Sequence, residues 1–115
     1  MKTTEAQLNT LSFFKGQEKF IMQPGQIIRL EADSNYTRVF FTDHPPVLMA
    51  KVLRMYDELL KPFGFIRPHR SHLVNLQHVE RLDERGVILM CDASRVEISR
   101  RKRRQLRLNL KSSIQ

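Results

Sequence analysis

The sequence predicts a mostly β domain with one central amphipathic helix and one C-terminal helix at its margins. Short runs rich in Ile, Val, Phe, Tyr and Thr recur along the chain, separated by Gly, Pro, Asn and Asp, as in strands joined by turns. One stretch in the middle changes to the apolar spacing of a helix. A chain of 115 residues can build one modest hydrophobic core. We therefore expect a single domain over residues 11–115, preceded by a flexible lead-in at residues 1–10.

Five short strands are expected before the central helix. They are bounded by turn residues such as Gly16, Pro24 and the polar run at 33–35, which favour chain reversal. In the fourth strand Val39 and Phe41 fall on one face, and the residues between them fall on the other. The expected strands cover residues 11–14, 19–22, 27–32, 36–42 and 47–50.

The central helix is predicted over residues 52–60, where apolar residues recur every three or four positions. Charged residues occupy the opposite side. The helix is expected to end before Pro62, because proline has no N–H for a helical hydrogen bond. The apolar positions are Val52, Leu53, Tyr56, Leu59 and Leu60.

Three further strands and a last helix are expected in the C-terminal half. Ser99 can cap a final helix over about residues 100–110, anchored on Leu106 and Leu110. The strands are expected at residues 79–83, 87–91 and 95–98, with a hairpin turn at 84–86.

Positive charge is concentrated near the C-terminus. The chain has a net charge of +8, and residues 95–111 contribute eight basic side chains against one acid. The first 94 residues hold 12 basic and 11 acidic side chains and are nearly neutral. Such a segment favours a polyanionic partner, although it also fits a solvated charged face or a basic tail. A membrane-surface helix is disfavoured, because the segment lacks a large aromatic or leucine face.

The motifs give no support to enzyme chemistry. The chain contains no GxGxxG, no phosphate-binding loop and no HExxH motif. His69 and His72 are spaced for a shared metal only in a helix, with His78 further away, and no second ligand cluster accompanies them. Ser71 and Cys91 stand in no nucleophile motif, and Cys91, which ends an apolar run, is expected in the core. We therefore expect no enzyme activity, no cofactor and no metal.

Five consecutive basic residues, 100–104, stand at the start of the expected last helix. Cations there oppose the helix dipole, but they become favourable when a phosphate sits at the helix N-terminus. Four of the five are Arg, which binds phosphate or guanine with two parallel hydrogen bonds. They cannot all face one way on a helix, so some would contact DNA and others would be solvated.

A second polar group lies within residues 65–76, FIRPHRSHLVNL. Donors suited to phosphates and bases occupy almost every position that is not apolar. The alternative is a polar turn between helix and strand, and for Asn75 alone that alternative is preferred. The polar residues are Arg67, His69, Arg70, Ser71, His72 and Asn75.

Four ordered blocks resemble the LytTR family of bacterial DNA-binding domains. FIRPHRSHLVNLQHVERL (65–82) is similar to the family core F-x-R-x-H-R-S-x-L-V-N, which leads into a strand. IIRLEADSNYTRVFFTD (27–43) resembles its strand pair with an N-Y turn, and LMAKVLRMYDELL (48–60) resembles its helix. VEISRRKRRQL (96–106) resembles its S-R-R end. The resemblance spans about residues 11–111, nearly the whole chain.

The resemblance implies an elongated fold of antiparallel β-sheets with short flanking helices. It also implies a transcriptional regulator that reads successive major grooves of double-stranded DNA through loops and helix ends. The family's base-contacting positions correspond to Thr37, Arg70 and Arg100. Supporting or phosphate contacts are expected from Asn35, Tyr36, Arg38, Arg67, His69, Ser71, Asn75, Ser99, Arg101, Lys102 and Arg104.

Family members commonly bind paired direct repeats in promoters, and a homodimer on DNA is compatible with such sites. Most carry a receiver domain or a membrane segment before the DNA-binding domain. This sequence shows neither of them. For the membrane segment, no apolar run reaches the roughly 20 residues of a membrane span. We expect a stand-alone cytoplasmic regulator related to two-component signalling, unless these residues are part of a longer protein.

Two other classes of function remain open on the sequence. A non-catalytic protein-interaction module of a signalling pathway would use the sheet edges to bind its partner. An RNA-binding domain would need the exposed aromatic ladder that such surfaces use, and the sequence does not offer one.

Overall fold

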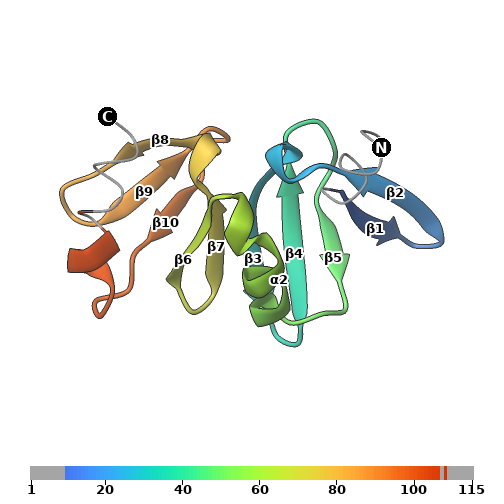
Figure 1. The fold of residues 1–115 in the computed structure, drawn as a ribbon, viewed down its shortest axis with the longest axis horizontal. Coiled ribbons are helices and arrows are strands. Elements are labelled where there is room, and N and C mark those ends of the chain that lie inside the picture. The colour runs from blue at the N-terminus through green and yellow to red at the C-terminus, as the bar shows by residue number, and fades with distance from the viewer. Residues whose placement is uncertain (1–9, 107, 109–115) are drawn as a thin grey trace.

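The computed structural model describes residues 10–106 and 108. In this part of the chain, ten strands form three antiparallel sheets of two, five and three strands. The sheets lie side by side along the longest axis of the molecule, with the five-stranded sheet in the middle (Figure 1). The predicted mostly β architecture with short flanking helices is confirmed.

The central sheet consists of β3 (Ile27–Asp33), β4 (Tyr36–Phe41), β5 (Val47–Met49), β6 (Phe65–His69) and β7 (His72–Asn75). Their order across the sheet is β5-β4-β3-β7-β6. Strands β3, β4 and β5 agree with the sequence prediction. Strands β6 and β7 do not, since the sequence predicts only a polar turn before a strand in this segment. A two-residue reversal at Arg70 and Ser71 joins them into a hairpin, and β7 pairs with β3 at the middle of the sheet.

The two smaller sheets flank the central one. A hairpin of β1 (Leu11–Lys15) and β2 (Glu18–Met22) lies at one end, and β8 (Val79–Leu82), β9 (Val87–Met90) and β10 (Arg95–Glu97) lie at the other. All five strands agree with the predicted ones to within one residue at each end. The helical elements are α2 (Leu53–Leu60) and the 3-10 turns η1 (Pro24–Gln26), η2 (Lys61–Phe63) and η3 (Leu76–His78).

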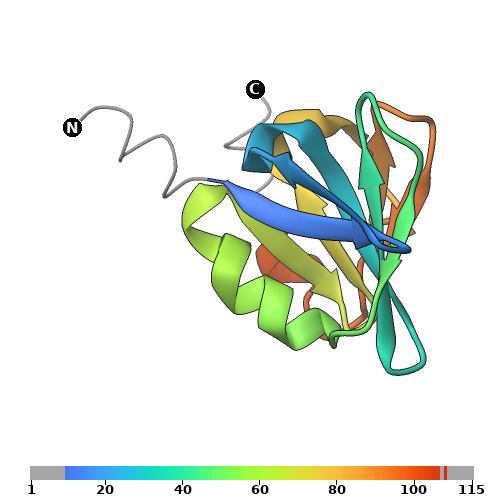
Figure 2. The same ribbon diagram turned by 90° about the vertical axis from the view of Figure 1, so that its right-hand side faces the viewer.

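The central sheet is covered on both faces, so the domain has two apolar clusters. Helix α2 and the β1–β2 hairpin pack on one face, and the view from the β1–β2 end shows α2 lying along it (Figure 2). The three-stranded sheet packs on the other face. Neighbouring residues of β7 enter different clusters, because side chains alternate along a strand: Leu73 faces α2 and Val74 faces the three-stranded sheet. Both are 0% exposed.

Helix α2 buries a narrower apolar stripe than the sequence predicts. Val52 and Leu59 were expected on the buried face, but they are 52% and 50% exposed. The helix does end before Pro62, which enters the 3-10 turn η2. The buried positions are Leu53, Tyr56 and Leu60, which are three and four residues apart and therefore lie on one side of the helix.

The predicted C-terminal helix is wrong at its start. Residues 100–102 form a turn, and helical geometry begins at residue 103, where the Leu106 amide donates to the Lys102 carbonyl at 2.9 Å. Leu106 packs against the apolar cluster of the three-stranded sheet, as predicted, whereas Leu110 lies outside the described residues. The run of basic residues therefore begins in a turn and not in the first turn of a helix.

Two residues that were expected to contact DNA lie in the interior instead. Thr37 is 0% exposed, and its hydroxyl donates to the Lys51 carbonyl at 2.6 Å. Asn75 is 1% exposed; its amide donates to the Ile27 carbonyl at 2.9 Å, and its oxygen accepts from the Gln77 amide at 3.0 Å. Neither side chain is exposed for the DNA contact that was expected of it. Both side chains satisfy backbone groups for which burial without a partner would be costly.

Asn75→Ala is expected to lower the free energy of unfolding by about 2–3 kcal/mol, because backbone groups of η1, β3 and η3 lose a buried partner. Chemical denaturation followed by circular dichroism measures the change. Asn35→Ala, in the exposed turn between β3 and β4, is the control and should shift the free energy by no more than about 0.5 kcal/mol. Equal losses in the two variants would contradict this role of Asn75.

Candidate nucleic-acid interface

Three polar segments singled out in the sequence gather at one end of the central sheet. They are the β3–β4 turn at 34–35, the β6–β7 turn at 70–71 and the turn at 99–102. Strands β3 and β7 are antiparallel with Glu31 opposite His72, so the end of β3 and the start of β7 share one end of the sheet. All three segments lie along the lower edge in Figure 1. We call this edge the contact edge.

Hydrogen bonds join the three segments through the β6–β7 hairpin. On one side, the Ala32 amide at the end of β3 donates to the Ser71 carbonyl at 2.9 Å. On the other side, the Ser99 amide donates to the Pro68 carbonyl at 2.8 Å. The hairpin is therefore the link between the first and third segments, which are far apart in the sequence.

The second and third segments together line a hollow of about 620 Å³. Its lining contains only basic, imidazole and hydroxyl side chains, so it presents positive charge and hydrogen-bond donors without an acid. Side chains of these types commonly contact phosphates and the guanine edge. The lining residues are His69, Arg70, Ser99, Arg101 and Lys102, all of which the sequence analysis placed in the site.

The imidazole of His69 has a defined role in the hairpin turn. Its Nδ1 lies 3.1 Å from the amide of Ser71, which donates to it. A ring nitrogen that accepts a hydrogen bond carries no proton, so in neutral His69 the proton is on Nε2. Nε2 is then a hydrogen-bond donor on a residue that lines the hollow.

The third segment spreads its basic side chains over two surfaces. Arg101 and Lys102 line the hollow beside the hairpin, whereas Arg100, Arg103 and Arg104 line a separate one with Leu108. The side chain of Arg103, which the sequence analysis did not assign to the site, packs over the β8–β9 turn. A Cβ atom on Gly86 would lie only 2.9 Å from its Nε. The run of five basic residues indicates this segment in the sequence. Only the fold shows which of their side chains line each of the two hollows.

The first segment is nearly neutral. Arg38 forms an exposed ion pair with Asp33, at 2.9 Å between Nη2 and Oδ2. Asn35 is exposed in the turn, and the ring of Tyr36 is 46% exposed. This segment offers polar and aromatic contacts more than charge.

Arg67 does not reach outward from the contact edge. Its Nη2 donates to the Arg70 carbonyl at 2.7 Å, and its Nη1 lies 3.7 Å from Oδ2 of Asp57 on α2. Its own carbonyl accepts from Nζ of Lys102 at 2.8 Å. The predicted phosphate contact by Arg67 finds no support in this arrangement.

The predicted core position of Cys91 is wrong, because its side chain is exposed. Its Sγ lies 3.6 Å from Nδ1 of His78. Although Cys91 is exposed, partial desolvation by its neighbours, together with the carboxylates of Asp92 and Glu80, raises the pKa of the Cys91 thiol and disfavours the thiolate that a nucleophile needs. Among the described residues, no three His, Cys, Asp or Glu side chains gather closely enough to hold a metal ion. No described helix is long and apolar enough to cross a membrane.

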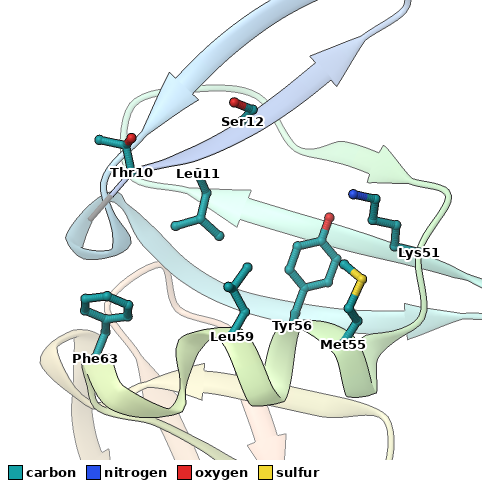
Figure 3. Close-up of a pocket in the computed structure, with 8 residues that line it drawn as sticks. All are labelled: Thr10, Leu11, Ser12, Lys51, Met55, Tyr56, Leu59 and Phe63. Atoms are coloured by element: carbon teal, nitrogen blue, oxygen red, sulfur yellow. The ribbon is translucent and has the colours of Figure 1, made fainter. Parts of the chain in front are cut away.

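A third concave surface, between α2 and β1, has a different character. Its volume is about 280 Å³, and Tyr56 and Leu59 point from α2 toward Leu11 on β1 (Figure 3). Apolar side chains dominate, and Lys51 is the charged residue in the lining. This groove offers a polyanion far less positive charge than the contact edge does.

Comparison with known proteins identifies the fold. The family model of the LytTr DNA-binding domain matches residues 17–111. The chain belongs to the LytTR family. A solved LytTr DNA-binding domain of a putative methyl-accepting/DNA response regulator from Bacillus cereus has a TM-score of 0.73 and 21% identity to this LytTR domain. The match covers 90% of this chain and 96% of that one, and it shows the shared fold. No curated protein matches.

Membership of the LytTR family establishes the coarse function of the domain. The matched family is one of DNA-binding domains, and its model covers the whole contact edge of this chain, from the β3–β4 turn to the turn at 99–102. DNA is therefore the partner of this LytTR domain.

His72 is a half-buried titratable group of this LytTR domain, next to the contact edge. Its Nδ1 is buried without a hydrogen-bond partner among the described residues. Burial lowers the pKa of His72 below its usual value of 6.5, while the charge of Glu31 acts in the opposite direction. The fold thus favours the neutral ring.

The free energy of unfolding is expected to fall as the pH drops below 6.5, because the unfolded chain then binds a proton that folded His72 binds only at lower pH. The stabilisation that comes from neutral His72 is fully present above pH 6.5. It is lost as the pH falls through the pKa of His72 in the folded chain. Other groups titrate in the same range, so the measurement compares urea denaturation of the wild type and His72→Gln between about pH 7.5 and 5.5. The variant should lose less stability. Parallel pH profiles would rule out this role of His72.

Proposed function

We propose that this LytTR domain reads double-stranded DNA sequence-specifically and acts as a non-catalytic transcriptional regulator in the bacterial cytoplasm. The observation that carries the proposal is the contact edge, in which three polar segments are joined by hydrogen bonds at one end of a sheet. Loops held on a rigid sheet suit groove reading, because little order has to be imposed when DNA binds.

Arg70 and Arg100 are the proposed base readers. Both are exposed, and a guanidinium can donate two parallel hydrogen bonds to O6 and N7 of guanine in the major groove. Arg70 stands in the hairpin turn beside His69, and Arg100 begins the turn of the third segment. Supporting and phosphate contacts are proposed for Asn35, Tyr36, Arg38, His69, Ser71, Ser99, Arg101, Lys102 and Arg104.

Paired direct repeats in promoters are the proposed target. A direct repeat presents the same bases again by translation along the duplex, so two chains would place identical contact edges in the same orientation. A homodimer would then form on the DNA itself, as each chain occupies one repeat.

The alternative of a protein-interaction module based on sheet edges is less well supported. Exposed edges recruit partner strands when they are long and regular. Here β5 and β10 have three residues each, and β6 carries Pro68, which has no N–H to donate. These features disfavour strand addition at those three edges.

Binding is expected to weaken steeply with salt. If about six phosphates are contacted, the logarithm of the association constant should fall against the logarithm of salt concentration with a slope of about −5. The measurement is fluorescence anisotropy with a duplex selected from a randomised pool and with a scrambled duplex of the same length. Equal affinity for the two duplexes would overturn the proposal of sequence specificity.

Arg70→Ala and Arg100→Ala should each relax the preference at particular bases and reduce binding to the selected duplex by about 1–3 kcal/mol. Arg101→Ala removes the same side chain from a proposed phosphate contact and is the matched comparison. It should weaken binding to selected and scrambled duplexes alike and make the salt slope shallower by about 1. An unchanged base preference in the first two variants would show that the base readers lie elsewhere.

A further inference from the structure

The inward position of Arg67 raises the question of what its guanidinium does. Its side chain is 23% exposed, and Nε is buried without a hydrogen-bond partner among the described residues. Nη2 donates to the carbonyl of Arg70, three residues along the chain, at 2.7 Å. The Arg67 side chain thus spans the hairpin turn and holds the backbone of the residue proposed to read a base.

Asp57 forms an ion pair with the other side of the same guanidinium. Its Oδ2 lies 3.7 Å from Nη1, and its side chain is 22% exposed, so the pair is better shielded from solvent than a surface ion pair. A guanidinium is planar and rigid, so contacts at Nη1 and Nη2 together set its orientation. Because Asp57 belongs to α2, the ion pair links the hairpin turn to a helix that is packed on the core.

The backbone of Arg67 also serves the third segment. Its carbonyl accepts from Nζ of Lys102 at 2.8 Å, and the next carbonyl, of Pro68, accepts from the Ser99 amide at 2.8 Å. A displacement of this part of β6 would therefore shift both the hairpin turn and the neighbouring turn at 99–102.

We propose that Asp57 and Arg67 are positioning residues that orient Arg70 for base recognition, and that Arg67 neutralises no phosphate. This inference rests on the proposed function. An acid within an otherwise basic region opposes a polyanion by long-range repulsion. Asp57 therefore favours DNA binding only if its hold on Arg67 outweighs that repulsion.

The two possible roles of Arg67 give opposite signs for Asp57→Asn. If Arg67 were a phosphate ligand restrained by Asp57, loss of the carboxylate would free it and strengthen binding. If Arg67 positions Arg70, the same change loosens the turn and weakens binding to the selected duplex. Glu58→Gln is the matched control, because Glu58 is the next residue of α2, is exposed and has no ion pair among those found in the described residues.

The experiment measures anisotropy of the full chain with the selected and the scrambled duplex over a range of salt concentrations. Asp57→Asn should lower affinity for the selected duplex about tenfold, with little change for the scrambled one and an unchanged salt slope. Glu58→Gln should raise affinity for both duplexes slightly and equally. Arg67→Lys keeps the charge but loses the planar fork, and it should reproduce the loss of Asp57→Asn.

A double-mutant cycle separates positioning from general loss of structure. In the Arg70→Ala background, Asp57→Asn should cause no further loss of discrimination between the duplexes, because the side chain that it orients is gone. Persistence of the full loss in that background would overturn the inference. So would stronger binding by Asp57→Asn, or a salt slope shallower by about 1 in Arg67→Met.

The failure of this inference is distinguishable from failure of the proposed function. A wild-type chain that binds both duplexes equally overturns the proposed function, and this inference falls with it. A wild-type chain that discriminates, together with an Asp57→Asn variant that behaves as Glu58→Gln does, overturns the inference alone.

Discussion

The contact edge depends on the hydrogen bonds that one hairpin accepts from both of its neighbours. The carbonyls of Pro68 and Ser71 lie on opposite sides of the β6–β7 turn, and they receive the amides of Ser99 and Ala32 at 2.8 and 2.9 Å. Each bond satisfies a backbone carbonyl and at the same time fixes the distance between two contact segments. Without them, three loops from different parts of the chain would share an end of the molecule but not a defined spacing.

This hairpin is held from both faces of the central sheet. Phe65 and Leu73 enter the cluster under α2, while Val74 enters the cluster under the three-stranded sheet and Ile66 packs against it. Strands buried on two sides cannot tilt without opening a cavity in one core or the other. The peripheral elements therefore contribute to recognition although they contact no DNA in our proposal. They restrict the conformational freedom of the contact segments in advance. Less conformational entropy is then lost when DNA binds, which favours affinity.

Local sequence pattern predicts most of the strands, because alternation and turn residues mark them. It fails at β6 and β7, where a register shift between Ile66 and His69 and consecutive buried residues in β7 break the alternation. Local pattern also fails at Thr37 and Asn75, because Thr and Asn are residue types usually found at the surface. Their burial follows from partners at Lys51 and Ile27, 14 and 48 residues away, and no local pattern carries that information. The basic run was visible in the sequence, whereas its division between two surfaces depends on the turn that replaces the start of the expected helix.

The three segments differ in charge, and this sets what each can contribute. The pairing of Arg38 with Asp33 leaves the first turn nearly neutral, so in our proposal Tyr36 and Asn35 act there through shape and hydrogen bonding. The residues of 100–104 form no ion pair found within the described part of the chain, and in our proposal they supply most of the attraction to phosphates. In the proposed interface, electrostatic attraction is therefore concentrated in the third segment, which also holds the proposed base reader Arg100. The β6–β7 hairpin combines an exposed Arg70 at its tip with Arg67, which pairs with Asp57, behind it.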